Sequence, residues 1–136
     1  MEFLKFSLSG FDDFLIHFGL AILFVAAFLW VYMLVTPYNE LQLIRAGNAS
    51  AAWSLGFAML GFSLPLASAI IHSVNPWDMT LWAAIALAVQ ILVFVVVRLL
   101  LPEVTRHIQE GQVSSGAFLG LLSLAAGVLN AASMTY

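Results

Sequence analysis

The chain has no cysteine and very few charged residues. Because no Cys occurs among the 136 residues, disulfides, thiolate metal sites and cysteine nucleophiles are all excluded, whereas the redox compartment stays open. Only 8% of the residues are charged and 63% are hydrophobic, while a soluble domain typically has about a quarter charged residues. Since so few charges cannot cover a soluble surface, we expect the whole chain to be a membrane module.

Motifs of catalysis and of nucleic-acid binding are also missing. The sequence contains no HExxH zinc motif and no glycine-rich phosphate loop, and the segment GFSLP at 61–65 does not match the GxSxG nucleophile turn. The four Lys and Arg residues form no basic patch for nucleic acid. We therefore expect a non-enzymatic protein with no cofactor and no bound metal.

Four hydrophobic runs are long enough to cross a bilayer, which takes about 20 residues. These runs cover residues 14–36, 50–74, 79–101 and 114–136. Each run must be helical, because every backbone polar group in lipid needs an internal partner and the alternation typical of a barrel is absent. The sequence therefore predicts an all-α membrane protein, with residues 1–136 forming a single domain of four transmembrane helices.

The positions of Lys and Arg predict the orientation of these helices. An even number of spans puts both termini and the loop 75–78 on one side, which holds only Lys5. The other side holds Arg45, Arg98 and Arg106. Because positive charge favours the cytoplasmic side, we predict an N-out/C-out protein in the bacterial inner membrane, with the two longer loops in the cytoplasm.

The two halves of the chain resemble each other. Aligning Gly47 with Gly111 also aligns Ser50 with Ser114 and Gly56 with Gly120. We predict two parallel-oriented helical-hairpin repeats, at residues 12–74 and 78–136, related by a pseudo-twofold axis along the membrane normal. The alternative is chance similarity between apolar helices.

Both inner loops contain a proline, then an acidic residue, spaced apolar residues and a glycine. We expect the first helix of each hairpin to continue past Pro37 or Pro102 and to stop at Gly47 or Gly111, where glycine serves as a C-cap. These extensions are either docking sites for a cytoplasmic partner or amphipathic turns that lie on the membrane interface.

Small residues recur along the second and fourth runs at helical spacing. Because lipid is as apolar as leucine, membrane helices pack through such residues. Pro65 also removes the hydrogen bond to the carbonyl of Gly61. Core packing of a four-helix bundle is the simplest use, and oligomer contacts or pore lining are the alternatives. The candidate helix-packing residues are Gly56, Gly61, Pro65, Ser68, Gly116, Gly120, Ser123 and Gly127.

Three polar side chains within the runs need partners, because polar groups are costly in a membrane. Gln90 lies at the centre of the third run and Asn130 lies in the fourth. We predict that these two amides pair across the bundle and act as structural contacts. Arg98 lies one turn from the end of its run, and we expect its guanidinium to reach the interface.

The outer side gathers Asp13, His17, His72 and Asp78. Asp13 and His17 are four residues apart and therefore share a helical face. Two histidines with nearby carboxylates form a candidate cation or proton site. The alternative is that the aspartates only interact favourably with the positive N-termini of helices.

Four segments of the chain carry a family resemblance, namely LQLIRAGN at 41–48, LGFSLPLASAI at 60–70, RLLLP at 98–102 and GVLNAASMTY at 127–136. In these segments the chain resembles the YjfL-like family of bacterial inner-membrane proteins, domain-of-unknown-function family three hundred and fifty. The resemblance covers nearly the whole chain and implies a multi-pass inner-membrane protein. Family members are often encoded beside relatives of the phage-shock membrane-remodelling protein and beside ATP-grasp enzymes resembling glutathionylspermidine synthetase. That association implies a role in membrane stress or in handling polyamines or other cations, and it supplies no catalytic residues.

The leading hypothesis is a membrane component that uses its packing residues to form a homo-oligomer or to recruit a membrane-stress protein at the two inner loops. The alternative is a small cation or polyamine channel or transporter. The two hypotheses differ in one observable. A permeation path requires a continuous hydrated track, whereas an assembly component seals its polar groups against each other. The side chains concerned are Ser63, Ser68, Gln90 and Asn130.

Overall fold

The computed structural model describes residues 1–134, which form only helices and no strand. Four helices are long, namely α2 (Phe11–Val35), α4 (Ala49–His72), α5 (Pro76–Leu100) and α7 (Val113–Ser133). Three are short, namely α1 (Glu2–Leu8), α3 (Glu40–Arg45) and α6 (Val104–Gln109). The four long helices are long and apolar enough to cross a membrane, which confirms the all-α prediction and the four spans. Residues 135 and 136, at the end of the fourth predicted run, lie outside the described residues.

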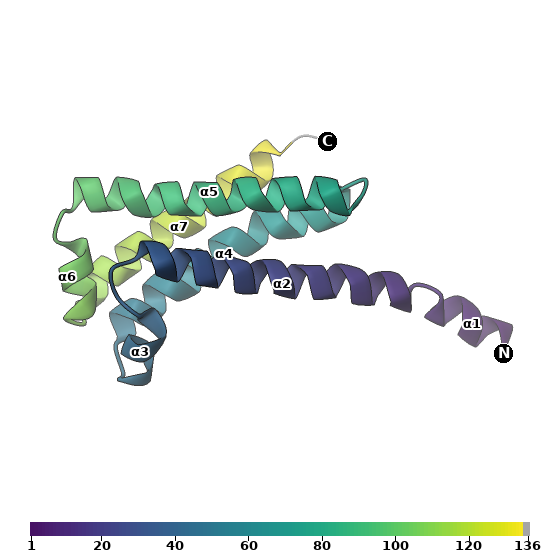
Figure 1. The fold of residues 1–136 in the computed structure, drawn as a ribbon, viewed down its shortest axis with the longest axis horizontal. Helices are drawn as coiled ribbons and strands as arrows, with labels where there is room; N and C mark the ends of the chain where they lie inside the picture. The colour runs from purple at the N-terminus through teal and green to yellow at the C-terminus, as the bar shows by residue number, and fades with distance from the viewer. Residues whose placement is uncertain (135–136) are drawn as a thin grey trace.

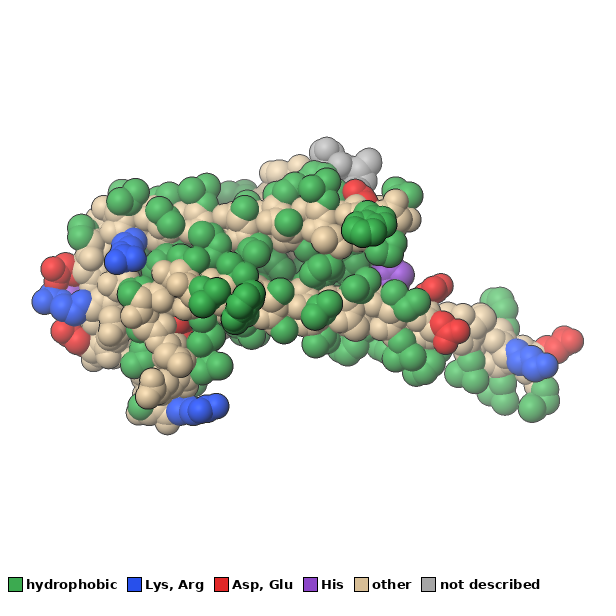
Figure 2. Space-filling view, viewed as in Figure 1, with side chains coloured by type: hydrophobic (Ala, Val, Ile, Leu, Met, Phe, Trp, Pro, Cys, Tyr) green, Lys and Arg blue, Asp and Glu red, His purple; other side chains and the backbone are tan. Residues whose placement is uncertain are grey.

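The long helices lie roughly along one direction, and the short helices α3 and α6 turn across them at one end (Figure 1). We call this end the α3–α6 end and the other the N-terminal end. Both halves of the chain have the same order of long, short and long helix. Hydrophobic side chains cover the long helices, and charged ones gather toward the two ends (Figure 2).

Asparagine side chains begin three of the helices. The side-chain oxygen of Asn39 accepts a hydrogen bond from the backbone N–H of Gln42, and Asn48 and Asn75 cap α4 and α5 in the same way. An N-cap acceptor satisfies one of the backbone donors that have no partner within the helix. The sequence therefore marks these starts locally, before any tertiary contact forms.

Glycine ends the short helices α3 and α6, as predicted. Gly47 and Gly111 have φ values of 90° and 85°, in the left-handed region that glycine adopts without a steric penalty. The N–H of Asn48 then donates to the carbonyl of Leu43 at 2.9 Å. An equivalent 2.9 Å bond joins Gln112 N–H to the His107 carbonyl. This pattern is a Schellman cap, which satisfies carbonyls at the helix end.

The predicted continuation of helices past the prolines is wrong. Helix α2 ends at Val35 and α5 ends at Leu100, before Pro37 and Pro102. A residue that precedes proline is disfavoured in the α conformation, and Thr36 accordingly has an extended backbone with φ −75° and ψ 142°. The segments beyond the prolines form the separate helices α3 and α6.

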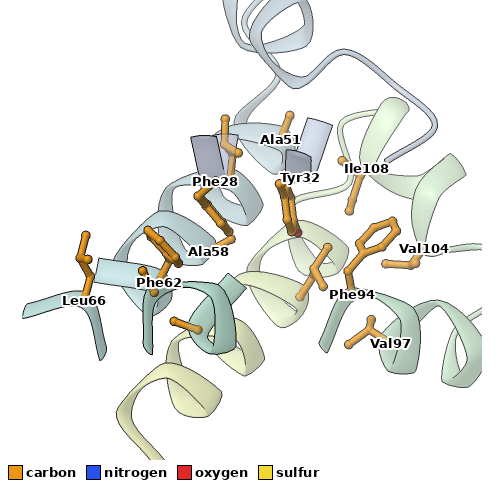
Figure 3. Close-up of a cluster of buried hydrophobic side chains, with 14 of the residues drawn as sticks. Phe28, Tyr32, Ala51, Ala58, Phe62, Leu66, Phe94, Val97, Val104 and Ile108 are labelled. Carbon is orange, nitrogen blue, oxygen red and sulfur yellow. The ribbon is translucent and has the colours of Figure 1, made fainter. Parts of the chain in front are cut away.

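The core is built around the α4–α7 pair. These two helices make the most extensive contact, α5 packs against both, and α2 contacts α4 and α5. Helix α2 contributes two buried aromatic rings (Figure 3). Phe28 stacks on Phe62 of α4 with ring centroids 4.7 Å apart, and Tyr32 meets Phe94 of α5 edge-on at 5.9 Å. Helix α2 is thus attached to the bundle through the half that lies near the α3–α6 end.

Candidate functional site

Four glycines allow the backbones of α4 and α7 to approach each other closely. A Cβ atom added at Gly120 would lie 2.6 Å from the Trp53 carbonyl oxygen. One added at Gly127 would lie 2.5 Å from the α-carbon of Gly61, and one at Gly61 would lie 2.9 Å from the Ser123 carbonyl carbon. Gly116 lies in the same way against the backbone of Ser50. Since real Cβ contacts are essentially never shorter than 3.0 Å, these positions require glycine.

The other candidate packing residues lie at different places. Pro65 and Ser123 are buried, and the Ser123 hydroxyl donates to the Leu119 carbonyl at 3.0 Å. Ser68 is half-buried. Gly56 is exposed, and a Cβ there would meet nothing within 4 Å, so it packs against no other helix of the described chain, and a contact of Gly56 with a second chain stays a prediction. Gly56 lies five residues before Gly61, and this offset turns it toward another face of the helix.

The carbonyl of Gly61 has no backbone donor four residues later, because residue 65 is proline. The position where a Cβ of Gly127 would sit is occupied by this carbonyl oxygen. The α-carbon of Gly127 therefore faces an acceptor that helix α4 leaves free, as in weak Cα–H···O contacts between helices. Gly61, Pro65 and Gly127 thus all contribute to the place where the backbones of α4 and α7 are in contact, which we call the crossing point.

Gln90 lies at the same crossing point and is fully buried. Its side-chain Nε2 donates to the carbonyl of Ser123 at 3.1 Å, so the predicted pair with Asn130 is not formed. The reason is geometric, because the glycine contacts bring the Ser123 carbonyl to the Gln90 amide, while Asn130 lies two helical turns farther along α7. Among residues 1–134, Gln90 Oε1 and Asn130 Nδ2 are buried without a hydrogen-bond partner.

The four residues of the predicted outer site do not converge. Asp13 and His17 line a hollow of about 260 Å³ together with Ser73 and Asn75 at the N-terminal end, and His17 Nδ1 lies 2.7 Å from the Asp13 carbonyl oxygen. His72 and Asp78 are not part of its lining.

Those two side chains have other contacts. His72 Nδ1 lies 3.0 Å from the Ser68 carbonyl oxygen. Asp78 Oδ2 accepts from the N–H of Val74 at 3.3 Å. Within the described residues, no three His, Asp or Glu side chains are placed to hold a metal ion.

The α3–α6 end contains a buried acid, Glu40, which is the acidic residue that follows Pro37 in the first inner loop. The side chain of Glu40 is only 1% exposed. The hydroxyl of Thr36 donates to Glu40 Oε1 at 2.7 Å, and Oε2 is buried with no hydrogen-bond partner in the described structure. Burial raises the pKa of the Glu40 carboxyl above its usual value, and hydrogen bonds from the Thr36 hydroxyl and from the backbone of Glu40 itself partly oppose this shift. The four-residue spacing of Thr36 and Glu40 was the only sequence signal, and it spans a proline.

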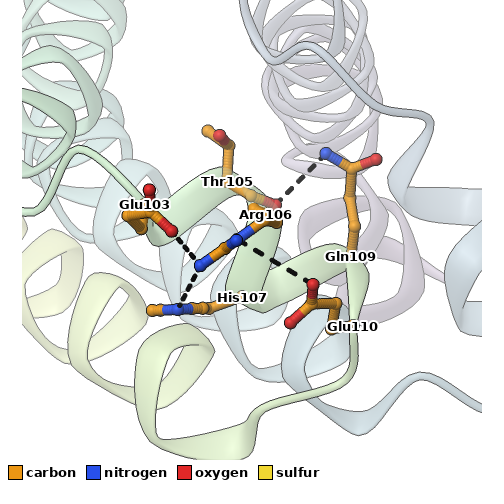
Figure 4. A network of polar contacts seen from close by, with 6 residues as sticks. All are labelled: Glu103, Thr105, Arg106, His107, Gln109 and Glu110. Carbon is orange, nitrogen blue, oxygen red and sulfur yellow. Dashed lines mark hydrogen bonds and ion pairs between the residues drawn. The ribbon is translucent and has the colours of Figure 1, made fainter.

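Glu103, which also follows a proline, lies in a different environment. It is exposed and pairs with Arg106 on α6, and Arg106 lies 3.8 Å from Glu110 (Figure 4). Such exposed ion pairs contribute little to stability. Arg98, the third polar candidate within the spans, is exposed in the last turn of α5. Burial and then the interaction with Glu40 raise the pKa of Tyr38, and the charge of Arg98 partly opposes this shift.

Two polar side chains fasten the two halves of the chain together at this end. Asn48 Nδ2 donates to the carbonyls of Ile108 at 2.7 Å and of Gln109 at 3.3 Å. Ser50 Oγ donates to the carbonyl of Gln112 at 2.6 Å. The beginning of α4 is therefore tied to the end of α6. Helices α3 and α6 lie at the same end of the bundle (Figure 1), and we call these two helices the α3–α6 platform.

Comparisons with known proteins agree on one family. The family model described as Domain of Unknown Function (DUF350) matches residues 6–134. The UPF0719 inner membrane protein YjfL of Escherichia coli strain K12 is 39% identical over 120 residues, which cover 88% of this chain and 91% of that protein. The protein of the same name from Escherichia coli O157:H7 matches equally well. No solved structure matches the chain.

Proposed function

This chain belongs to the DUF350 family and is a multi-pass protein of the bacterial inner membrane, and on that premise we propose that it is a non-enzymatic component that acts by assembling with other chains. The observation that carries the proposal is the closed middle of the bundle. Gln90 and Ser123 are fully buried there and are bonded to each other. Polar groups that are buried and hydrogen-bonded to each other do not line a hydrated path, so they favour a role in assembly over conduction through a single chain.

The packing residues on α4 and α7 face each other within one chain, so assembly requires another surface. The first two turns of α2 carry exposed phenylalanines, with Phe14 54% and Phe18 55% exposed. Only 11% of the most apolar part of the first span is buried, against 44% for α4. We take a second copy of the chain to contact this half of α2, because α2 has the least intramolecular contact of the long helices.

Cross-linking tests this contact, and the natural absence of cysteine makes single-cysteine variants simple. Phe14→Cys and Phe18→Cys should form disulfide-linked dimers on mild oxidation in native membranes. Leu92→Cys, on an exposed face of α5, is the matched control and should stay monomeric. Equal cross-linking at all three positions, or none at α2, would contradict a specific α2 contact.

The α3–α6 platform is the proposed docking site for a membrane-stress partner. Hydrogen bonds from the Asn48 side chain, which lies just after α3, join this segment to the end of α6. The side chain of Arg45, the last residue of α3, is exposed. This role rests on the N-out/C-out orientation, which puts the platform in the cytoplasm. It also rests on the proposed duplication of one hairpin, in which each repeat supplies one short helix to the platform.

The docking role predicts a charge-dependent interaction. Vesicles that contain the chain should retain a purified protein of the phage-shock membrane-remodelling type, and Arg45→Glu should weaken this retention. Lys5→Glu reverses a charge at the opposite end and should have no effect. Equal retention by vesicles without the chain would refute the docking role.

A second candidate function is the conduction of cations or polyamines. The observation in its favour is the hollow at the N-terminal end, where Asp13 and His17 lie together. A cation flux in proteoliposomes that disappears in a folded Gln90→Leu, Asn130→Ala double mutant would favour conduction over the assembly role. A flux that is no larger than that of empty liposomes would rule conduction out.

A further inference from the structure

The Glu40 carboxyl lies at the corner where α2 turns into α3. It is 1% exposed, the Thr36 hydroxyl donates to its Oε1 at 2.7 Å, and its Oε2 has no hydrogen-bond partner within the described residues. The same hydroxyl lies 3.2 Å from the Tyr38 carbonyl and 3.3 Å from the Met33 carbonyl. A six-residue helix, α3, begins with this buried acid. The corner therefore depends on a carboxyl group that the surrounding protein satisfies only in part.

The charged and titratable groups around Glu40 do not neutralise it. Tyr32 of α2 and Tyr38 of the connecting segment interact electrostatically with Glu40, and both are neutral phenols at ordinary pH. The positive charge of Arg98, on α5, interacts with Tyr38 and lowers the pKa of that phenol. The ion pairs of the described residues are both made by Arg106, with Glu103 and Glu110, so no cationic side chain pairs with Glu40.

A buried carboxylate without a cationic partner is strongly unfavourable, and the group takes up a proton instead. We propose that Glu40 is a proton-binding site, which holds a proton while α3 is seated against the bundle and releases it when this corner opens. Proton binding and the seating of α3 are then linked by mass action. The site gives the α3–α6 platform a response to pH, in addition to its proposed docking role.

The sign of this linkage follows from the raised pKa of the Glu40 carboxyl. The closed corner binds more protons than the open one at every pH between the ordinary glutamate pKa and the raised pKa, so rising pH favours opening in that window. Because each opening of the corner releases one proton, the equilibrium constant for opening changes about tenfold for each pH unit in this window. Above the raised pKa both states are ionised, and the dependence levels off.

Infrared spectroscopy of the full chain in lipid nanodiscs tests the proton directly. At a pH above the ordinary glutamate pKa the wild type should still show the carbonyl stretching band of a protonated carboxyl, because burial raises the pKa of the Glu40 carboxyl. Glu40→Gln should remove the band, and Glu103→Gln should leave it unchanged. A wild type without the band, or a band that survives in Glu40→Gln, would overturn the proposal.

Thiol labelling tests the linkage between the proton and the corner. Leu43 of α3 packs against the core and Leu41 of the same helix is 46% exposed. The labelling rate of Leu43→Cys divided by that of Leu41→Cys measures opening and cancels the pH dependence of thiol ionisation. We expect this ratio to rise about tenfold per pH unit in the window defined above. In the Glu40→Gln background, where the Thr36 bond can still form, the ratio should be constant.

Two outcomes of the labelling experiment would overturn the proposal. One is a ratio that does not change with pH in the wild type, and the other is a ratio that keeps its slope in the Glu40→Gln background. Both outcomes are independent of cross-linking at α2 and of retention on vesicles, so the proton site can fail or stand separately from the proposed assembly and docking roles.

Discussion

The α4–α7 pair and helix α2 are both membrane-spanning, yet they are held in the bundle in opposite ways. Helices α4 and α7 meet through glycines that leave no room for a side chain, at Gly61, Gly116, Gly120 and Gly127. Helix α2 has no such contact, because Gly19 has open space around it, and the two buried residues of α2 are Phe28 and Tyr32. The α4–α7 pair is therefore held by direct contact between two backbones, whereas α2 is held by two buried aromatic rings.

This difference matters because lipid provides no hydrophobic driving force between helices. Membrane helices associate through dispersion contacts and polar contacts, which require a close approach of the backbones. The α4–α7 pair satisfies that requirement along most of its length, whereas α2 satisfies it only near the α3–α6 end. We therefore expect α4 and α7 to form the rigid part of the chain, with the N-terminal half of α2 available to a second copy.

The largest effect should follow from Gly127→Leu. A leucine there would overlap the backbone of Gly61, and overpacking typically costs about 1–3 kcal/mol, and more where backbone rather than a side chain must move. We expect a loss of about 3 kcal/mol or failure to assemble the bundle, measured by unfolding in detergent.

The matched control is Gly56→Leu, the same substitution on α4 at a glycine with nothing within 4 Å. It should leave stability unchanged or raise it slightly, since glycine is a poor helix former. Equal losses for the two variants would mean that bulk anywhere on α4 or α7 is harmful and that the close crossing is not special.

A smaller effect is expected from Phe28→Ala, which removes the ring that stacks on Phe62. A buried Phe→Ala change costs about 3–5 kcal/mol in soluble cores. We expect about 2 kcal/mol here, because a phenylalanine ring that leaves its contact in the bundle is transferred to lipid rather than to water. Hydrogen exchange should increase in α2 and stay unchanged in α4 and α7. Phe14→Ala, at an exposed position of the same helix, is the control, and an equal response to both changes would show that α2 is not anchored at Phe28.

Much of this comparison could be predicted from the sequence. Hydropathy located the four spans, since crossing a bilayer needs a length of apolar helix that few other structures have. The glycine spacing of the fourth span predicted its contact face, and Gly47 and Gly111 predicted where the short helices end. These features are local or periodic, so they can be read without knowing which helices are neighbours.

The remaining features depend on which groups meet in three dimensions. The shared pattern of the inner loops, a proline followed by an acidic residue, made Glu40 and Glu103 look equivalent, but the fold buries Glu40 and leaves Glu103 beside Arg106. Gln90 was expected to find another amide, but the glycine crossing offers it a backbone carbonyl that no sequence pattern marks. Gly56 has the residue type of a packing position and faces open space. Each of these outcomes is decided by helix rotation and by the choice of neighbours.

A still smaller effect is expected from Thr36→Val, at the corner that anchors α2. The change removes the hydrogen bond to Glu40 Oε1, and we expect a cost of about 1 kcal/mol. Since this bond lowers the pKa of the Glu40 carboxyl, its loss should raise that pKa further. The labelling ratio of Leu43→Cys to Leu41→Cys should then keep rising to a higher pH than in the wild type.

The control for this change is Thr80→Val, which removes an exposed hydroxyl that bonds to the Pro76 carbonyl. It should leave the pH dependence of the labelling ratio unaltered. A shift of the dependence to lower pH in Thr36→Val would contradict the role of this hydroxyl as a donor to the carboxyl.

The smallest effect concerns the two amides of the bundle interior. Gln90 donates to the Ser123 carbonyl rather than to Asn130, and hydrogen bonds between membrane helices average about 0.6 kcal/mol. Gln90→Leu should therefore cost about 0.6 kcal/mol or less, and Asn130→Ala should be nearly neutral or slightly stabilising, because Asn130 Nδ2 is buried without a partner within residues 1–134. The two effects should be additive, because the two side chains share no hydrogen bond. A double-mutant cycle measured by unfolding in detergent tests this expectation. A coupling energy clearly above the experimental error would mean that the amides pair after all, and that the α5–α7 contact is made by side chains rather than through the backbone of the glycine crossing.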